Sequence, residues 1–227
     1  MASDELREAR REARGEAIVF VLVAAGLLIA LAATSLAFGW ELVGVEGWVW
    51  FLICLPELAL AGVMLLRERA DDERAHELLQ LSISFVVLGN LAGLVLLVTA
   101  LLTEKSSDLT AAQLLLSGAT VWLANVIVFG LWFWTLDSGG PLRRALVGRR
   151  TPDFRFPQDE NRDLAGEGWY PRLEDYVYVA LTNAIAFSPT DAMPLTRQAK
   201  ALMALEAGIS VAAVLLVAAR AVNVLGS

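Results

Sequence analysis

The chain has 227 residues, of which 57% are hydrophobic, and its mean hydropathy is +0.58. Soluble domains average ~45–50% apolar residues, so this composition excludes an ordinary soluble domain and predicts an all-α integral membrane protein. The net charge of −7 comes without any basic block, so we expect the lipid bilayer, and no nucleic acid, as a partner.

Four apolar segments within residues 17–136 predict a four-helix transmembrane region. The segments are 17–38, 47–66, 78–102 and 112–136. Each reaches the ~20 residues that a helix needs to cross a bilayer. A polar cytoplasmic tail, residues 1–16, precedes them. At the end of the fourth segment, Trp132, Phe133 and Trp134 predict an aromatic belt at the membrane interface.

The distribution of Lys and Arg predicts the orientation in the membrane. The 1–16 tail carries four such residues, the 67–77 loop three and the 137–172 loop seven, whereas the 39–46 and 103–111 loops carry zero and one. Basic residues accumulate in cytoplasmic loops, so we expect a multi-pass protein with a cytoplasmic N-terminus. The Arg-rich 137–172 segment, interrupted by glycine and proline, is then a cytoplasmic loop.

The C-terminal part, residues 173–227, predicts a short helix over 174–187, a turn, and a last transmembrane helix over about 199–222. The apolar run before the turn, residues 176–187, is shorter than the ~20 residues of a straight span. It either crosses as a short span or re-enters from the cytoplasm. Length favours re-entry, and the charge count slightly favours crossing. The sequence therefore predicts about six membrane segments, the fifth (174–189) being short or re-entrant.

Polar side chains inside the predicted spans are candidates for function. Glu57, Asn90 and Asn125 stand near the centres of the second, third and fourth spans. Equal depth predicts one midplane polar cluster suited to a proton or a hard monovalent cation. Alternatively, the two Asn residues join helices by hydrogen bonds and Glu57 is buried and protonated. Glu206, two turns into the last span, is expected to be buried against another helix or a second subunit.

The chain lacks the patterns that carry enzymatic chemistry. It shows no His/Cys cluster with metal-ligand spacing, no Gly-x-Ser-x-Gly elbow and no phosphate-binding glycine loop. We therefore expect no catalytic residues, no metal and no cofactor, and we do not expect an enzyme.

In the turn before the last helix, the run Asp191-Ala-Met-Pro194-Leu-Thr196 precedes a basic residue, Lys200, and Thr182 stands near the end of the short helix before the turn. This order resembles the pore of potassium channels, in which a pore helix and a filter are followed by such a run, a basic residue and the inner helix. The resemblance implies a pore or turn formed by Thr182, Asn183, Phe187, Ser188, Pro189, Thr190 and Asp191. The filter departs from the channel pattern, because residues 186–190 contain no glycine to direct successive carbonyls at an ion.

A second resemblance covers residues 131–225. The aromatic helix end, the Gly139-Gly140 turn, Phe156-Pro157, Asp175-Tyr176, Ser188-x-x-Asp191 and the ending Ala219-Arg-Ala-Val-Asn223 are similar to an uncharacterised family of bacterial multi-pass inner-membrane proteins. Some of its relatives look like two-pore-domain potassium channels. The family has no settled activity, so the resemblance implies a fold, a bacterial inner-membrane location and a candidate pore in residues 173–227.

Two functions follow as hypotheses. The leading one is an ion-channel-like or cation-translocating membrane protein without a conventional potassium filter, assembled as a homo-oligomer, in which Asp191 and Glu57 face water. The alternative is a non-conducting structural or partner-binding membrane protein. Its turn is a capped corner, with Asp191 or Ser188 bonded to backbone amides and Thr196 capping the last helix.

Overall fold

A computed structural model of the chain describes residues 110–140, 151–161, 169–186 and 192–225, together with scattered residues elsewhere. Contacts divide the chain into two compact units, which we treat separately. The first unit consists of residues 1–20 and 129–208. The second unit consists of residues 21–128 and 209–227.

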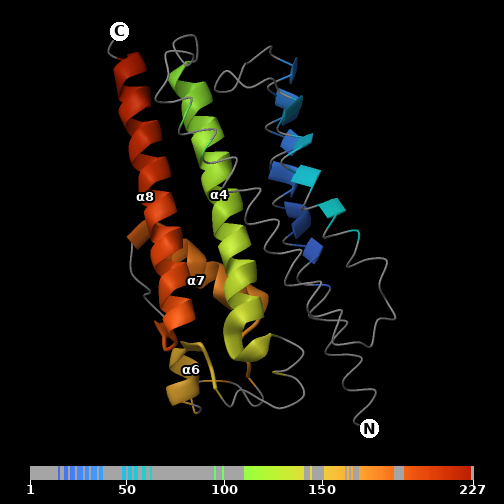
Figure 1. The fold of residues 1–227 in the computed structure, drawn as a ribbon, viewed down its shortest axis with the longest axis vertical. Helices are drawn as coiled ribbons and strands as arrows, with labels where there is room; N and C mark the ends of the chain where they lie inside the picture. Colours follow the sequence, from blue (N-terminus) through green and yellow to red (C-terminus); the bar gives the residue numbers. More distant parts are fainter. Residues whose placement is uncertain are drawn as a thin grey trace. The chain divides into compact units, whose positions relative to one another are not determined.

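The described part is mostly helical, as the all-α prediction requires (Figure 1). Its elements are helix α4 (Ala111–Leu136), the 3-10 turn η2 (Asp137–Gly139), strand β1 (Phe154–Arg155), helix α6 (Pro157–Glu160), helix α7 (Leu173–Ala186), strand β2 (Met193–Pro194) and helix α8 (Arg197–Leu225). Helices α4, α7 and α8 confirm the helices predicted over the fourth span, the short segment and the last span.

Two helices of the described part are long and apolar enough to cross a membrane by length and composition. They contain the stretches Gly118–Gly139 and Arg197–Ala219. The first three predicted spans lie mostly outside the described residues. The residues described between Gly15 and Gly62 are all in helical conformation, and so are Val95 and Thr99.

Both ends of α4 are set by local sequence signals. At its start, the Thr110 N–H donates to the Gln113 side chain and the Gln113 N–H donates back to the Thr110 hydroxyl, at 2.7 and 3.3 Å, which forms a capping box. At its end, three successive residues have positive φ: Ser138 (56°), Gly139 (78°) and Gly140 (95°). Glycine accepts this region freely, and the two glycines therefore let the chain turn sharply after the helix.

The predicted aromatic belt at the end of α4 is wrong for two of its three members. Phe133 and Trp134 are buried, and only Trp132 is partly exposed. The reason is that the following segment folds back over this helix end and covers it with Phe154, which is fully buried. The ring centroids of Phe133 and Phe154 are 5.1 Å apart. What was predicted as a polar loop therefore contributes to the core of the first unit.

Glycines allow α4 to pack closely in each unit. In the first unit, a Cβ built on Gly130 would lie 2.6 Å from a methyl group of Val177 and 2.7 Å from its Cα, so α7 crosses α4 at a point where only glycine fits. In the second unit, a Cβ on Gly118 would lie 2.6 Å from a methyl group of Val217 on α8. Backbones that approach this closely are typical of helices packed through small residues.

The short sheet ties two distant segments together in the first unit. Strands β1 and β2 are antiparallel, with Phe154 opposite Pro194 and Arg155 opposite Met193. Beyond the sheet, the Leu195 N–H donates to the Asp153 carbonyl at 2.8 Å. The chain that leads into α8 is thereby held against the chain that follows α4.

Candidate functional site

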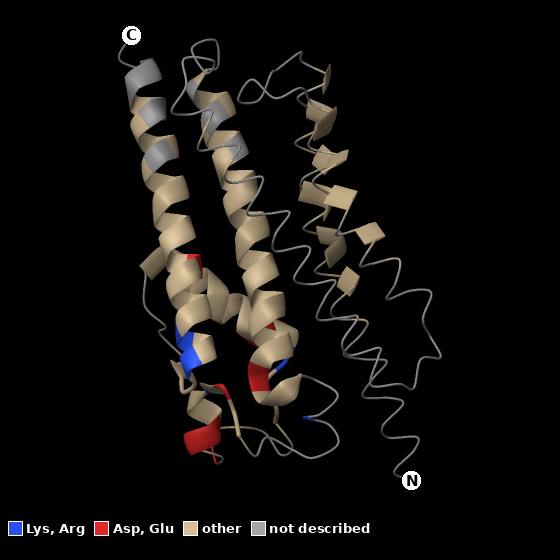
Figure 2. Cartoon of the chain, viewed as in Figure 1, with Lys and Arg blue, Asp and Glu red and all other residues tan. Residues whose placement is uncertain are grey.

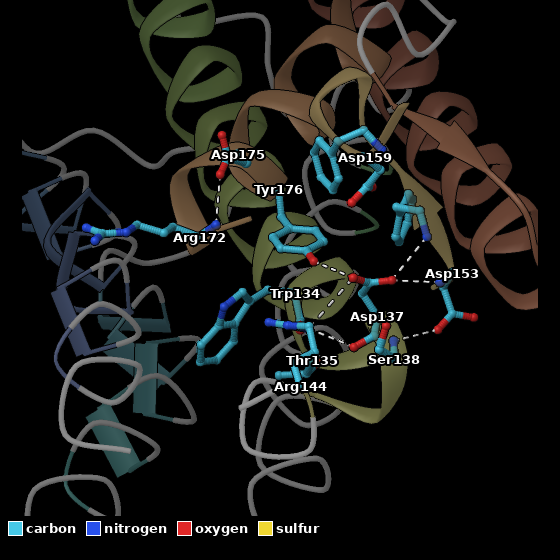
Figure 3. Close-up of polar contacts among 12 residues, drawn as sticks. Trp134, Thr135, Asp137, Ser138, Arg144, Asp153, Asp159, Arg172, Asp175 and Tyr176 are labelled. Carbon is cyan, nitrogen blue, oxygen red and sulfur yellow. Dashed lines mark hydrogen bonds and ion pairs between the residues drawn. The ribbon is translucent and has the colours of Figure 1, made fainter. Parts of the chain in front are cut away.

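A buried carboxylate organises the end of α4. We call the group formed by Asp137, Ser138, Arg144, Asp153, Phe154, Tyr176 and Thr196 the Asp137 corner. Figure 3 labels its members Asp137, Ser138, Arg144, Asp153 and Tyr176. Asp137 is fully buried, and its Oδ1 accepts from the backbone N–H groups of Asp153 (2.6 Å) and Phe154 (3.1 Å). Its Oδ2 accepts from the Tyr176 hydroxyl at 2.5 Å. One side chain thus joins α4, the segment that leads into β1, and α7.

Arg144 supplies the positive charge of the corner. Its Nη1 lies 4.0 Å from Asp137 Oδ2 and donates to the carbonyls of Trp134 and Asp137, both at 2.7 Å. Its guanidinium carbon lies 5.9 Å from the Trp134 ring centroid and 5.3 Å from that of Tyr176. These distances fit cation–π contacts, which gain strength where water is excluded. The buried carboxylate of Asp137 therefore lies beside the positive charge of the largely buried Arg144 guanidinium.

Asp153 connects the corner to the start of α8. Its Oδ2 accepts from the Ser138 N–H at 3.0 Å, and its Oδ1 accepts from the Thr196 hydroxyl at 2.7 Å. The Thr196 oxygen in turn accepts from the Ala199 N–H at 3.2 Å, which confirms the prediction that Thr196 caps the last helix. The end of α4 and the beginning of α8 thus meet at one place.

Helix α7 begins at the same corner. The Arg172 N–H donates to the Asp175 carboxylate at 2.7 Å, and Glu174 and Asp175 place negative charge in the first turn, where the helix dipole favours it. Burial raises the pKa of Asp175 above its ordinary value, and the Arg172 N–H opposes this shift. One turn later, Tyr176 bonds Asp137.

Helices α7 and α8 therefore both begin near the Asp137 corner. Asn183 lies ten residues beyond Leu173, and Glu206 lies ten residues beyond Thr196, about 15 Å along each helix axis. Their side chains meet, because Asn183 Nδ2 donates to Glu206 Oε2 at 2.8 Å. Figure 1 shows α7 crossing the first half of α8 obliquely. The segment that leads into α8 lies at the corner, because Thr196 bonds Asp153 and the Leu195 N–H donates to the Asp153 carbonyl.

The Asn183–Glu206 pair is the second buried polar group of the first unit. Glu206 is fully buried and Asn183 is 3% exposed. Asn183 Nδ2 also donates to the Met203 carbonyl at 2.9 Å, so the amide is fixed between two acceptors on α8. Glu206 Oε1 is buried and has no hydrogen-bond partner among the described residues. The expectation that Glu206 is buried against another helix is confirmed, and that helix is α7.

The other predicted site residues are less informative. Thr182 donates its hydroxyl to the Val179 carbonyl of its own helix at 3.0 Å. Asn125, in the second unit, is buried, and its amide nitrogen has no partner in the described part of the chain. Glu57, Asn90 and the turn residues Phe187, Ser188, Pro189, Thr190 and Asp191 lie outside the described residues. That Glu57, Asn90 and Asn125 form one midplane cluster, and that Asp191 and Glu57 face water, therefore stay predictions.

Sequence reasoning missed the Asp137 corner. Asp137 and Asp153 stood in a segment that its glycines and prolines marked as a loop, and charged loop residues are usually solvated. A usable signal was present, since Phe154 and Phe156 are large apolar residues inside that polar segment and predict that it folds onto a core. The contact between Asn183 and Glu206 had no sequence signal, because the two residues lie 23 positions apart.

Searches against protein-family models, curated proteins and solved structures each found no match for this chain. The two resemblances noted in the sequence therefore stay predictions.

Proposed function

We propose that the chain is a multi-pass membrane protein that translocates protons or monovalent cations, and that residues 173–196 form a hairpin that enters the bilayer and returns to the side of entry. The observation that carries the proposal is the common start of α7 and α8 at the Asp137 corner. Helix α7 has 14 residues and is about 21 Å long, which is less than the ~30 Å of a hydrocarbon core.

A re-entrant segment places unpaired backbone groups inside the bilayer at a cost in free energy, and its presence therefore points to a function. Backbone that is not helical is tolerated at membrane depth only where protein buries it or where it lines a watery cavity. A short helix followed by a returning segment and a full-length helix is also the order of a channel pore hairpin. Several copies of such a hairpin around one axis would form the pore, with Asp191 at its turn attracting cations.

Re-entry also agrees with the distribution of charge. If α8 starts on the side of the Arg-rich 137–172 loop, Arg197 and Lys200 join the basic side, and Lys105 and Arg220 remain on the other. A crossing would leave three basic residues on the outer side, so the slight preference for crossing drawn from the charge count does not hold. The proposed location is the bacterial inner membrane, with a cytoplasmic N-terminus and an external C-terminus.

The alternative is a non-conducting structural or partner-binding membrane protein. The Asp137 corner favours it, because a buried carboxylate with three hydrogen-bond donors and an adjacent arginine is a rigid joint. A rigid joint also suits a pore hairpin that must be held in place, so the corner alone does not separate the two functions.

Ion flux from proteoliposomes separates them. The purified full-length chain would be tested under K⁺, Na⁺ and H⁺ gradients, with Asp191→Asn beside the wild type. We expect flux above that of empty liposomes for at least one cation, and a changed rate in the variant. Absence of flux for all three cations, with the protein correctly inserted, would support the non-conducting alternative.

Cysteine labelling tests the hairpin independently of flux. Cys54 is the only cysteine, so Cys54→Ala provides a background without thiols. Single cysteines at Asp163, in the Arg-rich loop, and at Gln198, at the exposed start of α8, should react with an impermeant reagent from the same side. A cysteine at Ser227 should react from the opposite side. Reaction at positions 163 and 198 from opposite sides would refute re-entry.

A further inference from the structure

We propose that Glu206 is a proton-binding site at mid-membrane depth, and that the ion this protein moves is the proton. The inference rests on the proposed membrane function and names its ion. Glu206 lies about 15 Å along α8 from the Asp137 corner, which is half of a ~30 Å hydrocarbon core if the corner stands at the membrane surface. In Figure 2 the other charged positions near the start of α8 and the end of α4 gather around the corner.

The two oxygens of Glu206 have different surroundings. Oε2 accepts a hydrogen bond from Asn183 Nδ2, whose amide is also held by the Met203 carbonyl. An oxygen that accepts from an amide behaves as the carbonyl of a carboxylic acid. Oε1 is buried with no hydrogen-bond partner among the described residues, so it is the oxygen that carries the proton. Binding then converts a carboxylate and a hydronium ion into a carboxylic acid and water, and release reverses this.

Among the residues that the structure describes, none forms an ion pair with Glu206. Helix α4 has no charged residue, and the charged residues of α7 are Glu174 and Asp175 in its first turn. On α8 itself, Arg197 and Lys200 are exposed near the start of the helix, and Arg220 lies fourteen residues beyond Glu206, about 21 Å along the axis. A buried carboxylate without a counter-charge is costly in a low-dielectric environment, whereas the protonated acid is not. The surroundings therefore favour a bound proton at rest.

The same surroundings disfavour a metal cation. The polar group that meets the carboxylate is an N–H donor, which would repel a cation, and hard cations require several oxygen ligands at once. The described residues contain no cluster of three or more His, Cys, Asp or Glu side chains. A proton needs only one oxygen and a path for water. The re-entrant hairpin proposed above would line a watery cavity, and water could then reach the depth of Glu206.

Infrared spectroscopy tests the site without relying on transport. The full chain carrying Glu57→Gln, which removes the other acid expected inside the membrane, should show the carbonyl stretch of a protonated carboxylic acid in detergent at neutral pH, and adding Glu206→Gln should abolish it. Glu174→Gln is the matched control, because Glu174 is exposed, and should leave the band unchanged. Asn183→Leu should move the band to higher frequency, since the carbonyl loses its hydrogen bond. A missing band in the Glu57→Gln chain, or a band that survives the added Glu206→Gln, would overturn the inference.

Flux measurements distinguish this inference from the proposed function. We expect proton flux in wild-type proteoliposomes and at least a tenfold loss in Glu206→Gln, whose neutral amide preserves the shape of the protonated acid. Proton flux that Glu206→Gln leaves unchanged would overturn Glu206 as the transport site even if the protein conducts. If the infrared band is present but no cation flows, the proposed function is refuted. Glu206 would then be a buried protonated acid only, and the assignment of the proton as the transported ion would fall with it.

Discussion

The substitution Tyr176→Phe isolates the hydrogen bond that joins α7 to Asp137. It removes the hydroxyl that donates to Asp137 Oδ2 at 2.5 Å and keeps the ring, whose centroid lies 6.1 Å from that of Phe154 and 5.3 Å from that of Phe156. Hydrogen bonds to charged groups contribute about 1.5–3 kcal/mol. We expect the free energy of unfolding to fall by that amount, which is about a 10- to 100-fold change in the ratio of folded to unfolded protein.

The control is Tyr178→Phe, because Tyr178 lies on the same helix and is 50% exposed. Exposed substitutions usually change stability by no more than about 0.5 kcal/mol. Both variants would be unfolded reversibly with denaturant in detergent micelles and followed by tryptophan fluorescence. Equal losses in the two variants would refute the view that Asp137 holds α7 in place. A double-mutant cycle with Asp137→Asn should give a coupling energy of about 1–3 kcal/mol.

Three backbone substitutions make further predictions. Gly130→Ala should lower the free energy of unfolding by about 1–3 kcal/mol in the same assay, because the new methyl group would overlap the Cα of Val177. A variant as stable as the wild type would contradict the close crossing of α4 and α7. Gly208→Ala should stabilise the protein by up to about 1 kcal/mol, since no residue that the structure describes lies within 4 Å of the new methyl group. A loss of stability instead would contradict an open face at Gly208. Ser138→Gly should raise the melting temperature for two reasons. Glycine adopts the positive φ of 56° without strain, and the substitution removes a buried hydroxyl that lacks a partner among the described residues. A lower melting temperature would refute the view that the backbone at Ser138 is strained.

The sequence by itself determined the local structure of this protein. Runs of apolar residues predicted α4 and α8, and the shortness of the run before Phe187 predicted that α7 is too short for an ordinary span. The cap at Thr196 and the turn at Gly139 and Gly140 follow from side-chain and backbone preferences that act within a few residues. Such features depend on neighbours along the chain, so a single sequence contains them.

Only the tertiary structure decided where the polar side chains find partners. Asp137 bonds residues 16 to 39 positions away, and Glu206 bonds Asn183 at a distance of 23 positions. The contact of α7 with both α4 and α8 follows from these pairings and not from its hydropathy. Hydropathy measures the transfer of a side chain out of water, and this free energy is similar in lipid and in a protein core. For that reason Phe133 and Trp134 fitted a membrane belt in the sequence, while the folded chain buries Phe133 against Phe154 and Trp134 beside Arg144.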